Sequence, residues 1–125
     1  MNLEYLAEGL RDCPLIRLYD FNQAEARSLK NLVKSLVTGE RDSVHLHDEA
    51  WVESVAGCRL SLRRGTRDQA VREIAHLNFE YTLTSSGWSN VDGLLDPFCN
   101  SHAAGFQWLT HEGVVSILIS QDGRW

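Results

Sequence analysis

Apolar residues recur every three or four positions between residues 23 and 38, which is the spacing of one face of an α-helix. Asn22 and Glu25 precede this run and lie three positions apart, as in a helix N-terminal capping box. Gly39 follows the run, and glycine is the residue type that best accepts the left-handed conformation of a helix C-terminal cap. These features predict a helix over residues 23–38.

Three shorter segments alternate between apolar and polar residues: 43–47, 58–64 and 78–84. This alternation is typical of β-strands that bury one face and expose the other. We therefore expect neighbouring antiparallel strands that are covered on one side. Their outward-facing residues would be Ser43, His45, His47, Arg59, Ser61, Arg63, Asn78, Glu80, Thr82 and Thr84.

Two other segments, 15–21 and 114–120, carry apolar residues on both faces. Strands that are buried on both faces occupy central positions in a sheet. A further strand over 106–111 would pair with the last of these segments through a tight turn at Glu112 and Gly113.

The remaining segments have weaker helical patterns. Residues 3–10 place their leucines on one helical face, which predicts a helix. Residues 66–76 favour a short helix, with a long hairpin as the alternative. A further helix is expected to begin after Ser85 or Ser86 and to end near Pro97, because proline interrupts helical hydrogen bonding.

Strands that cluster between helices indicate an α+β fold. We expect one globular domain over residues 1–125, with a mixed or mainly antiparallel sheet of about five to six strands. About two to four helices would pack on one face of this sheet, and the N-terminal helical segment, residues 1–12, would lie at its periphery. Residues 48–57 fit either an extended strand or a loop, and the strand order is left open.

The composition of the chain mainly excludes certain classes of protein. The chain has 125 residues, with 12 Lys and Arg against 17 Asp and Glu, so its net charge is −5. This acidic balance argues against a nucleic-acid-binding protein. No apolar run reaches the roughly 18–20 residues of a membrane-spanning helix, and the first residues do not resemble a secretory signal. A cytoplasmic protein without a membrane partner is therefore expected, and its three widely spaced cysteines predict reduced thiols.

Arg27, Lys30 and Lys34 form a basic stripe on the helix predicted over residues 23–38, and Arg41 follows it. Such a stripe could contact an anion or a nucleic acid. Surrounding acidic residues balance its charge, so a solvated helix face is the favoured interpretation.

The outward face of the three alternating strands is the best candidate for a binding site. Residues two apart on a strand share a face, so His45 and His47 would lie side by side. Arginine on the same face could hold a carboxylate or phosphate at two points. The candidate ligand-binding residues are His45, His47, Arg59, Arg63 and Glu80, which would converge in a concave site. The alternative is an ordinary solvent-facing polar surface.

Histidines and cysteines raise the question of a metal site. His45, His47, Cys99 and His102 offer nitrogen and sulfur ligands of the kind that tetrahedral zinc accepts. Their spacing matches no established zinc motif, so no cofactor is predicted and zinc stays a minor hypothesis. Cys99 with His102 or His111 could also form a reactive thiolate pair, although such spacing is common by chance.

Two tryptophans, Trp51 and Trp125, are candidates for interface anchors, with packing over the edge of the core as the alternative. The sequence carries no catalytic signature, and the leading hypothesis is a non-enzymatic protein-interaction or regulatory module. It would act with a protein partner or as a homodimer through an edge strand. The alternative is a small-ligand or metal-dependent enzyme that uses the polar sheet face. Enzymatic activity is left open, and no catalytic residue is assigned.

Overall fold

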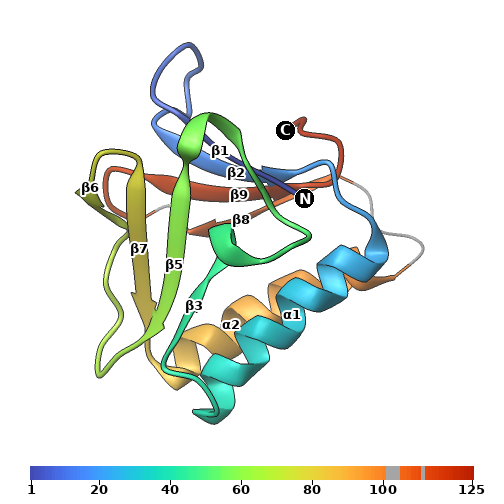
Figure 1. The fold of residues 1–125 in the computed structure, drawn as a ribbon, viewed down its shortest axis with the longest axis vertical. Coiled ribbons are helices and arrows are strands. Elements are labelled where there is room, and N and C mark those ends of the chain that lie inside the picture. Colours follow the sequence, from blue (N-terminus) through green and yellow to red (C-terminus); the bar gives the residue numbers. More distant parts are fainter. Residues whose placement is uncertain (101–104, 111) are drawn as a thin grey trace.

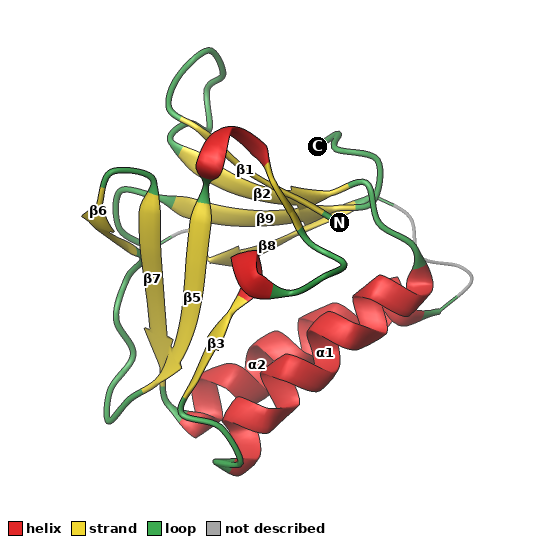
Figure 2. Ribbon diagram, viewed as in Figure 1, coloured by secondary structure: helices red, strands yellow, loops and turns green. Residues whose placement is uncertain are grey.

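The strands of the protein form two sheets, where the sequence predicts one. The computed structural model describes residues 1–100, 105–110 and 112–125, in which the two mixed sheets and two α-helices make an α+β fold (Figures 1 and 2). The first sheet has five strands in the order β4-β1-β2-β9-β8. Its strands are β1 (Asn2–Leu6), β2 (Leu15–Tyr19), β4 (Glu53–Ser54), β8 (Phe106–Thr110) and β9 (Ser116–Ser120).

The two strands with apolar residues on both faces occupy the middle of the first sheet, as predicted. β2 lies between β1 and β9, and β9 lies between β2 and β8. β2 and β9 run parallel, with Ile16 opposite Ile117 and Leu18 opposite Ile119. β8 and β9 pair antiparallel, which confirms the expected C-terminal hairpin.

The second sheet has four strands in the order β3-β5-β7-β6. β3 pairs antiparallel with β5, but β5 and β7 run parallel, so the expectation that all three alternating strands are antiparallel is wrong. The chain leaves β5, forms β6 at the far edge, and returns as β7 between the two. This return route makes β7 antiparallel to β6 and parallel to β5. The strands are β3 (Ser43–His45), β5 (Arg59–Arg64), β6 (Arg72–Ala75) and β7 (Asn78–Leu83).

Helix α1 (Gln23–Thr38) confirms the helix predicted for this segment. The Asn22 side chain accepts a hydrogen bond from the Glu25 amide, the Glu25 side chain accepts one from the Asn22 amide, and Gly39 has the left-handed φ of 79°. Its partner α2 (Ser85–Leu95) begins where predicted and continues into a 3₁₀ turn, η3 (Asp96–Cys99). The two helices lie side by side, and in the view of Figure 1 they are below the first sheet and to the right of β5 and β7. Neither α-helix in the described part of the chain is long and apolar enough to cross a membrane.

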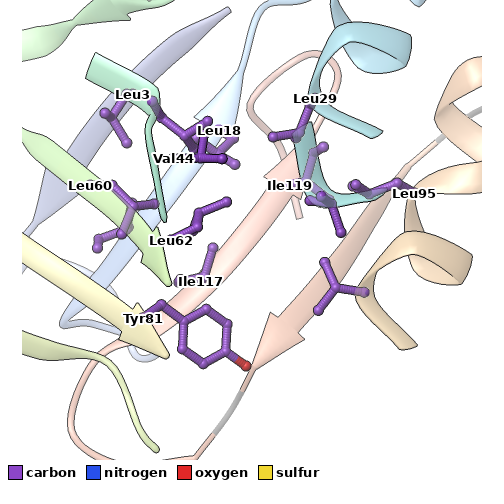
Figure 3. Close-up of a cluster of buried hydrophobic side chains, with 14 of the residues drawn as sticks. Leu3, Leu18, Leu29, Val44, Leu60, Leu62, Tyr81, Leu95, Ile117 and Ile119 are labelled. Carbon is purple, nitrogen blue, oxygen red and sulfur yellow. The ribbon is translucent and has the colours of Figure 1, made fainter. Parts of the chain in front are cut away.

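One apolar core joins both sheets to both helices. Leu18 comes from the first sheet and Leu62 from the second, and Leu29 and Leu95 come from α1 and α2 (Figure 3). Each of these four leucines is at most 5% exposed. The second sheet therefore buries the face that carries Leu60, Leu62 and Tyr81 and leaves its opposite, polar face toward solvent.

The N-terminal segment corrects one prediction, because residues 2–6 form a strand and no helix occurs over 3–10. β1 pairs with both β2 and β4, so it is an integral part of the first sheet and not a peripheral element. Leu3 is fully buried, whereas Leu10, on the expected apolar helix face, is 56% exposed. Pairing with β2 outweighs the helical spacing of the leucines, which a short apolar segment shows equally well as a strand.

Residues 66–76 correct a second prediction. They contain the strand β6 in a hairpin with β7, which was the alternative to the favoured helix. All four residues of β6 are exposed, and Val71 just before it is buried. A helix needs an apolar stripe to pack, and one buried side chain does not supply it.

Candidate functional site

A polar groove lies on the outer face of the second sheet and has a volume of about 420 Å³. The five candidate residues from the sequence all line it, so the structure brings them together in one concave site. Every strand of the second sheet contributes, together with the 3₁₀ turn η1 (Leu46–Asp48) that follows β3. The lining residues are Ser43, His45, His47, Arg59, Ser61, Arg63, Ile74, Asn78 and Glu80.

Strand register explains why these side chains meet. Arg59, Ser61 and Arg63 alternate along β5 and share its outer face. On one side, β3 places His45 opposite Ser61; on the other, β7 places Glu80 opposite the same serine. The centre of the groove is thus a row of three polar residues from three neighbouring strands.

His45 and Ser61 are directly linked at the centre of this row. The Nδ1 atom of His45 lies 2.7 Å from Oγ of Ser61. A serine next to a histidine can be a nucleophile and its base, but that chemistry also needs an accessible hydroxyl and a group that orients the imidazole. Ser61 is only 7% exposed, and no orienting hydrogen bond to the other ring nitrogen of His45 is found in the described residues. The pair therefore fits a cross-strand hydrogen bond better than a catalytic dyad.

His47 reaches the groove from a 3₁₀ turn and not from the strand that the sequence predicts, because β3 ends at His45. The two imidazole rings still lie close, with centroids 5.6 Å apart. The Nε2 atom of His47 is 3.8 Å from Oδ1 of Asp48, and its buried Nδ1 has no hydrogen-bond partner among the described residues. A buried ring nitrogen without a partner is costly, and because this atom is buried it does not face the groove.

Glu80 is held by two arginines. Its Oε2 atom accepts a hydrogen bond of 3.2 Å from Arg63, and its Oε1 atom accepts one of 3.0 Å from Arg72. Burial alone would raise the pKa of this carboxyl, but the hydrogen bonds and charges of the two guanidinium groups outweigh that effect and lower the pKa. Glu80 is consequently ionised at neutral pH and neutralises part of the positive charge around it.

Arg59 is in a different situation. Its side chain lines the groove, and its guanidinium makes no hydrogen bond or ion pair with any residue that the structure describes. Asn78 is its register partner on β7. An arginine with all five N–H donors free can bind a carboxylate or phosphate by donating two hydrogen bonds to it.

The candidate residues from the sequence omit five contributors to the groove environment. Ser43, Ser61 and Asn78 were among the outward-facing residues of the alternating strands, so the same pattern could have included them. Ile74 and Arg72 were missed because residues 66–76 were expected to form a helix. A hairpin interpretation would have placed Arg72 opposite Glu80, as the register of β6 and β7 does.

A metal site receives no geometric support where the structure describes the chain. Residues 1–100, 105–110 and 112–125 contain no group of three or more His, Cys, Asp or Glu side chains that could hold a metal ion. His102 and His111 lie outside the described residues. Cys99 lies in η3, away from the groove, and its Sγ atom is 3.5 Å from the carbonyl oxygen of Leu95. Burial is the main cause that raises the pKa of this thiol, which disfavours the reactive thiolate.

The interface candidates are both partly buried. Trp51 packs against the core, and Trp125 donates a 3.0 Å hydrogen bond from Nε1 to Oδ2 of Asp12. Neither side chain lines the groove. Their proposed role as anchors for a partner stays a prediction.

The residues of the basic stripe on α1 differ in their ion pairing. Nζ of Lys30 lies 2.8 Å from a carboxylate oxygen of Asp92 and 2.7 Å from one of Asp96, so this lysine links α1 to α2 and η3. Lys34 is exposed, with no ion pair to the residues described. Arg27 is exposed and donates hydrogen bonds to the side chain of Gln23 and the carbonyl oxygen of Cys99, with no ion pair to the residues described. Of the three cations of the stripe on α1, Lys30 is therefore the one that two carboxylates neutralise.

A second depression of about 360 Å³ lies between α2, β7 and β8. Its charged lining residues within the described chain are the acids Asp68 and Glu112, and no arginine or lysine lines it there. It is therefore poorly suited to an anion, in contrast to the groove on the second sheet.

No protein-family model matches this sequence, and no curated protein or solved structure matches it. The function is therefore argued from the geometry and charge of the groove.

Proposed function

We propose that the protein is a non-enzymatic binding module and that its groove binds the oxyanion group of a small ligand, either a carboxylate or a phosphate. Arg59 would hold this group. Asn78, which lines the same groove opposite Arg59, would add hydrogen bonds.

The observation that carries the proposal is the contrast between Arg59 and the other arginines near the groove. Arg63 and Arg72 already share the carboxylate of Glu80, whereas Arg59 has no partner in the described chain. An unpaired guanidinium in a concave polar site is a ready anion receptor, because charge-assisted bidentate bonds are stronger than neutral ones. The volume of about 420 Å³ falls within the range typical of small-molecule sites.

A binding role is favoured over catalysis by the state of the Ser61 hydroxyl. This group is almost covered and is already bonded to His45. Attack on a substrate would require this covered hydroxyl to become accessible, whereas binding of a ligand in the groove does not.

The test is a titration with inorganic phosphate at pH 7, followed by ¹H–¹⁵N NMR, with sodium chloride at equal ionic strength as the reference salt. We expect saturable binding, with a dissociation constant of about millimolar order for so small an anion, and shifts centred on β5 and β7. Replacing Arg59 with Gln should weaken this binding by about tenfold or more, because a charged hydrogen-bond donor is lost.

The matched control is Arg67→Gln, which removes the same charge from an exposed arginine outside the groove. It should bind phosphate as the unmodified chain does. Equal losses in both variants would show that phosphate responds only to net charge and would refute the proposal. Absence of saturable binding by phosphate and by acetate would also refute it.

The protein-interaction hypothesis stays a prediction beside this proposal. Large exposed apolar side chains occur at Leu10, Ile74, Phe106 and Val114, which lie on different strands and loops. Sedimentation equilibrium over a wide concentration range tests self-association directly. A concentration-dependent mass would favour an interaction module, and a constant monomer mass would remove the homodimer.

A further inference from the structure

Nearly all the side chains that line the groove around Arg59 carry hydrogen-bonding groups. Within the described chain, Ile74 is the one side chain in its lining that lacks a hydrogen-bonding group. Hydroxyl, amide, imidazole, guanidinium and carboxylate groups make up the rest. An aromatic or aliphatic ligand body would bury these groups without partners, which costs free energy. The ligand body must itself be rich in hydrogen-bonding groups.

Glu80 decides which kind of hydrogen-bonding group suits the groove. Each of its carboxylate oxygens accepts one side-chain hydrogen bond within the described chain, one from Arg63 and the other from Arg72. An ionised carboxylate offers about four lone-pair positions and no donor. Glu80 therefore keeps capacity to accept bonds from a ligand, and only a ligand donor can use it.

The same carboxylate disfavours a second anionic group on the ligand. It already supplies the negative charge that Arg63 and Arg72 would otherwise attract. An added anion at that end would compete with Glu80 for Arg63 and Arg72, so the unpaired Arg59 is the preferred position for the oxyanion of a ligand. The groove thus has one end for an anion, at Arg59, and a central and distal part for neutral donors.

Donor and acceptor groups of both kinds lie along the whole groove, with Asn78 opposite Arg59 at one end and Ser43 opposite Arg63 at the other. Asn78 offers an amide that donates and accepts, and Ser43 offers a hydroxyl that does both. Groups that both donate and accept hydrogen bonds suit the hydroxyl groups of a polyol, because each hydroxyl also donates one hydrogen bond and accepts others. The same groove would match a ligand with several ammonium groups poorly, since two arginines lie nearby.

We infer that the natural ligand is a polyhydroxylated compound with a single oxyanion, such as a sugar phosphate or a sugar acid, and that Glu80 is the residue that selects its hydroxyl groups. This inference rests on the proposed function, because it uses Arg59 as the anion receptor. It adds the class of the ligand and a specificity-determining residue.

The experiment compares five probes on the unmodified chain at pH 7 and constant ionic strength: phosphate, glucose 6-phosphate, acetate, gluconate and glucose. Glucose 6-phosphate should bind about tenfold more tightly than phosphate, and gluconate more tightly than acetate, because each added hydrogen bond contributes to affinity. Glucose alone should bind weakly. The phosphate and carboxylate arms show which oxyanion the groove prefers.

Glu80→Gln then tests the specificity residue. This variant loses the charged acceptor and releases Arg63 and Arg72, so phosphate should bind more tightly than to the unmodified chain. The preference for glucose 6-phosphate over phosphate should fall to about one, since the selecting acceptor is weakened. Glu8→Gln, in an exposed loop outside the groove, is the matched control and should keep the preference.

The outcomes separate the two proposals. If phosphate binds through Arg59 but glucose 6-phosphate gains nothing over it, the polyol inference is overturned and the anion-binding function stands. If none of the anionic probes binds, both fail. If Glu80→Gln keeps the full preference in a folded variant, Glu80 is not the specificity residue; the comparison of probes on the unmodified chain still decides the ligand class.

Discussion

The indole N–H of Trp88 donates a 2.8 Å hydrogen bond to the main-chain carbonyl oxygen of Arg63. This bond joins α2, in the helical layer, to β5, the strand that carries three groove residues. Trp88 is 1% exposed, and its ring packs edge-on against Tyr81 with centroids 5.4 Å apart. The strand whose outer face carries the groove is thus held in place by a hydrogen bond from the core on the inner face of the second sheet.

Replacing Trp88 with Phe should destabilise the protein, because the carbonyl of Arg63 loses a buried donor. We expect a loss of about 1–3 kcal/mol in the free energy of unfolding, the usual cost of an unsatisfied buried polar group, plus a smaller cavity cost. Urea unfolding followed by circular dichroism measures it. A variant as stable as the unmodified protein would show that this bond contributes no net stability.

Glu80 should make the stability of the protein depend on pH. Its pKa in the folded protein lies below the ordinary value, so its contribution is present above that ordinary value. The contribution is lost as the pH falls through the lowered folded-state pKa. Glu80→Gln should therefore be less stable than the unmodified protein at pH 7, and the difference should disappear in acid, once the pH is below the lowered pKa of the folded state.

The size of this difference should be about 1 kcal/mol or less, because Arg63 and Arg72 are more than half exposed and solvent screens their ion pairs. Urea unfolding at the two pH values measures it, with Glu8→Gln as the control that should show no difference at either pH. A gap that stayed constant from neutral to acid pH would mean that the charge of Glu80 is not its source.

Lys30 and Lys34 should behave differently although they lie one helical turn apart. Lys30→Gln removes the cation between Asp92 and Asp96, so we expect a loss of up to about 1 kcal/mol in the free energy of unfolding. Lys34→Gln should leave stability unchanged, because its side chain is exposed and unpaired within the described chain. Thermal unfolding of both variants measures the contrast, and equal effects would contradict it.

The helix α1 could be predicted from the sequence because its signals are local. Asn22 and Glu25 cap the helix by bonds within four residues, and the apolar spacing fixes which side is buried. The division into two sheets could not be predicted, because strand order depends on contacts between residues far apart in the chain. The parallel pairing of β5 and β7 exists only because β6 takes the edge position, and nothing local to β5 or β7 indicates that.

The candidate site, like the fold, has a part that the sequence predicts and a part that it does not. Alternation along the strands identified the outer face, and with it Arg59, Arg63 and Glu80, because a period of two is a property of each strand alone. Alternation could not identify Arg72, since its contact with Glu80 depends on the hairpin of β6 and β7. The pairing state of each arginine, which distinguishes Arg59 from Arg63, requires the three-dimensional structure.

Leu3 and Leu10 provide the sharpest test of the N-terminal segment, because a helix over residues 3–10 would place both on its apolar face. In the structure Leu3 is fully buried in β1, whereas Leu10 is 56% exposed. Leu3→Ala should lower the free energy of unfolding by about 2–5 kcal/mol, the usual cost of a large-to-small change in a core. Leu10→Ala should change it by less than about 0.5 kcal/mol, as at other surface positions.

Urea unfolding of the two leucine variants measures this difference, and backbone NMR shifts of residues 2–6 report the strand directly. Similar losses in both variants would mean that the two side chains share one buried face, as a helix requires. A large loss confined to Leu3→Ala would instead show that pairing with β2 decides the conformation of this segment. The first sheet, and the core it shares with the groove-bearing second sheet, would then depend on the first few residues described.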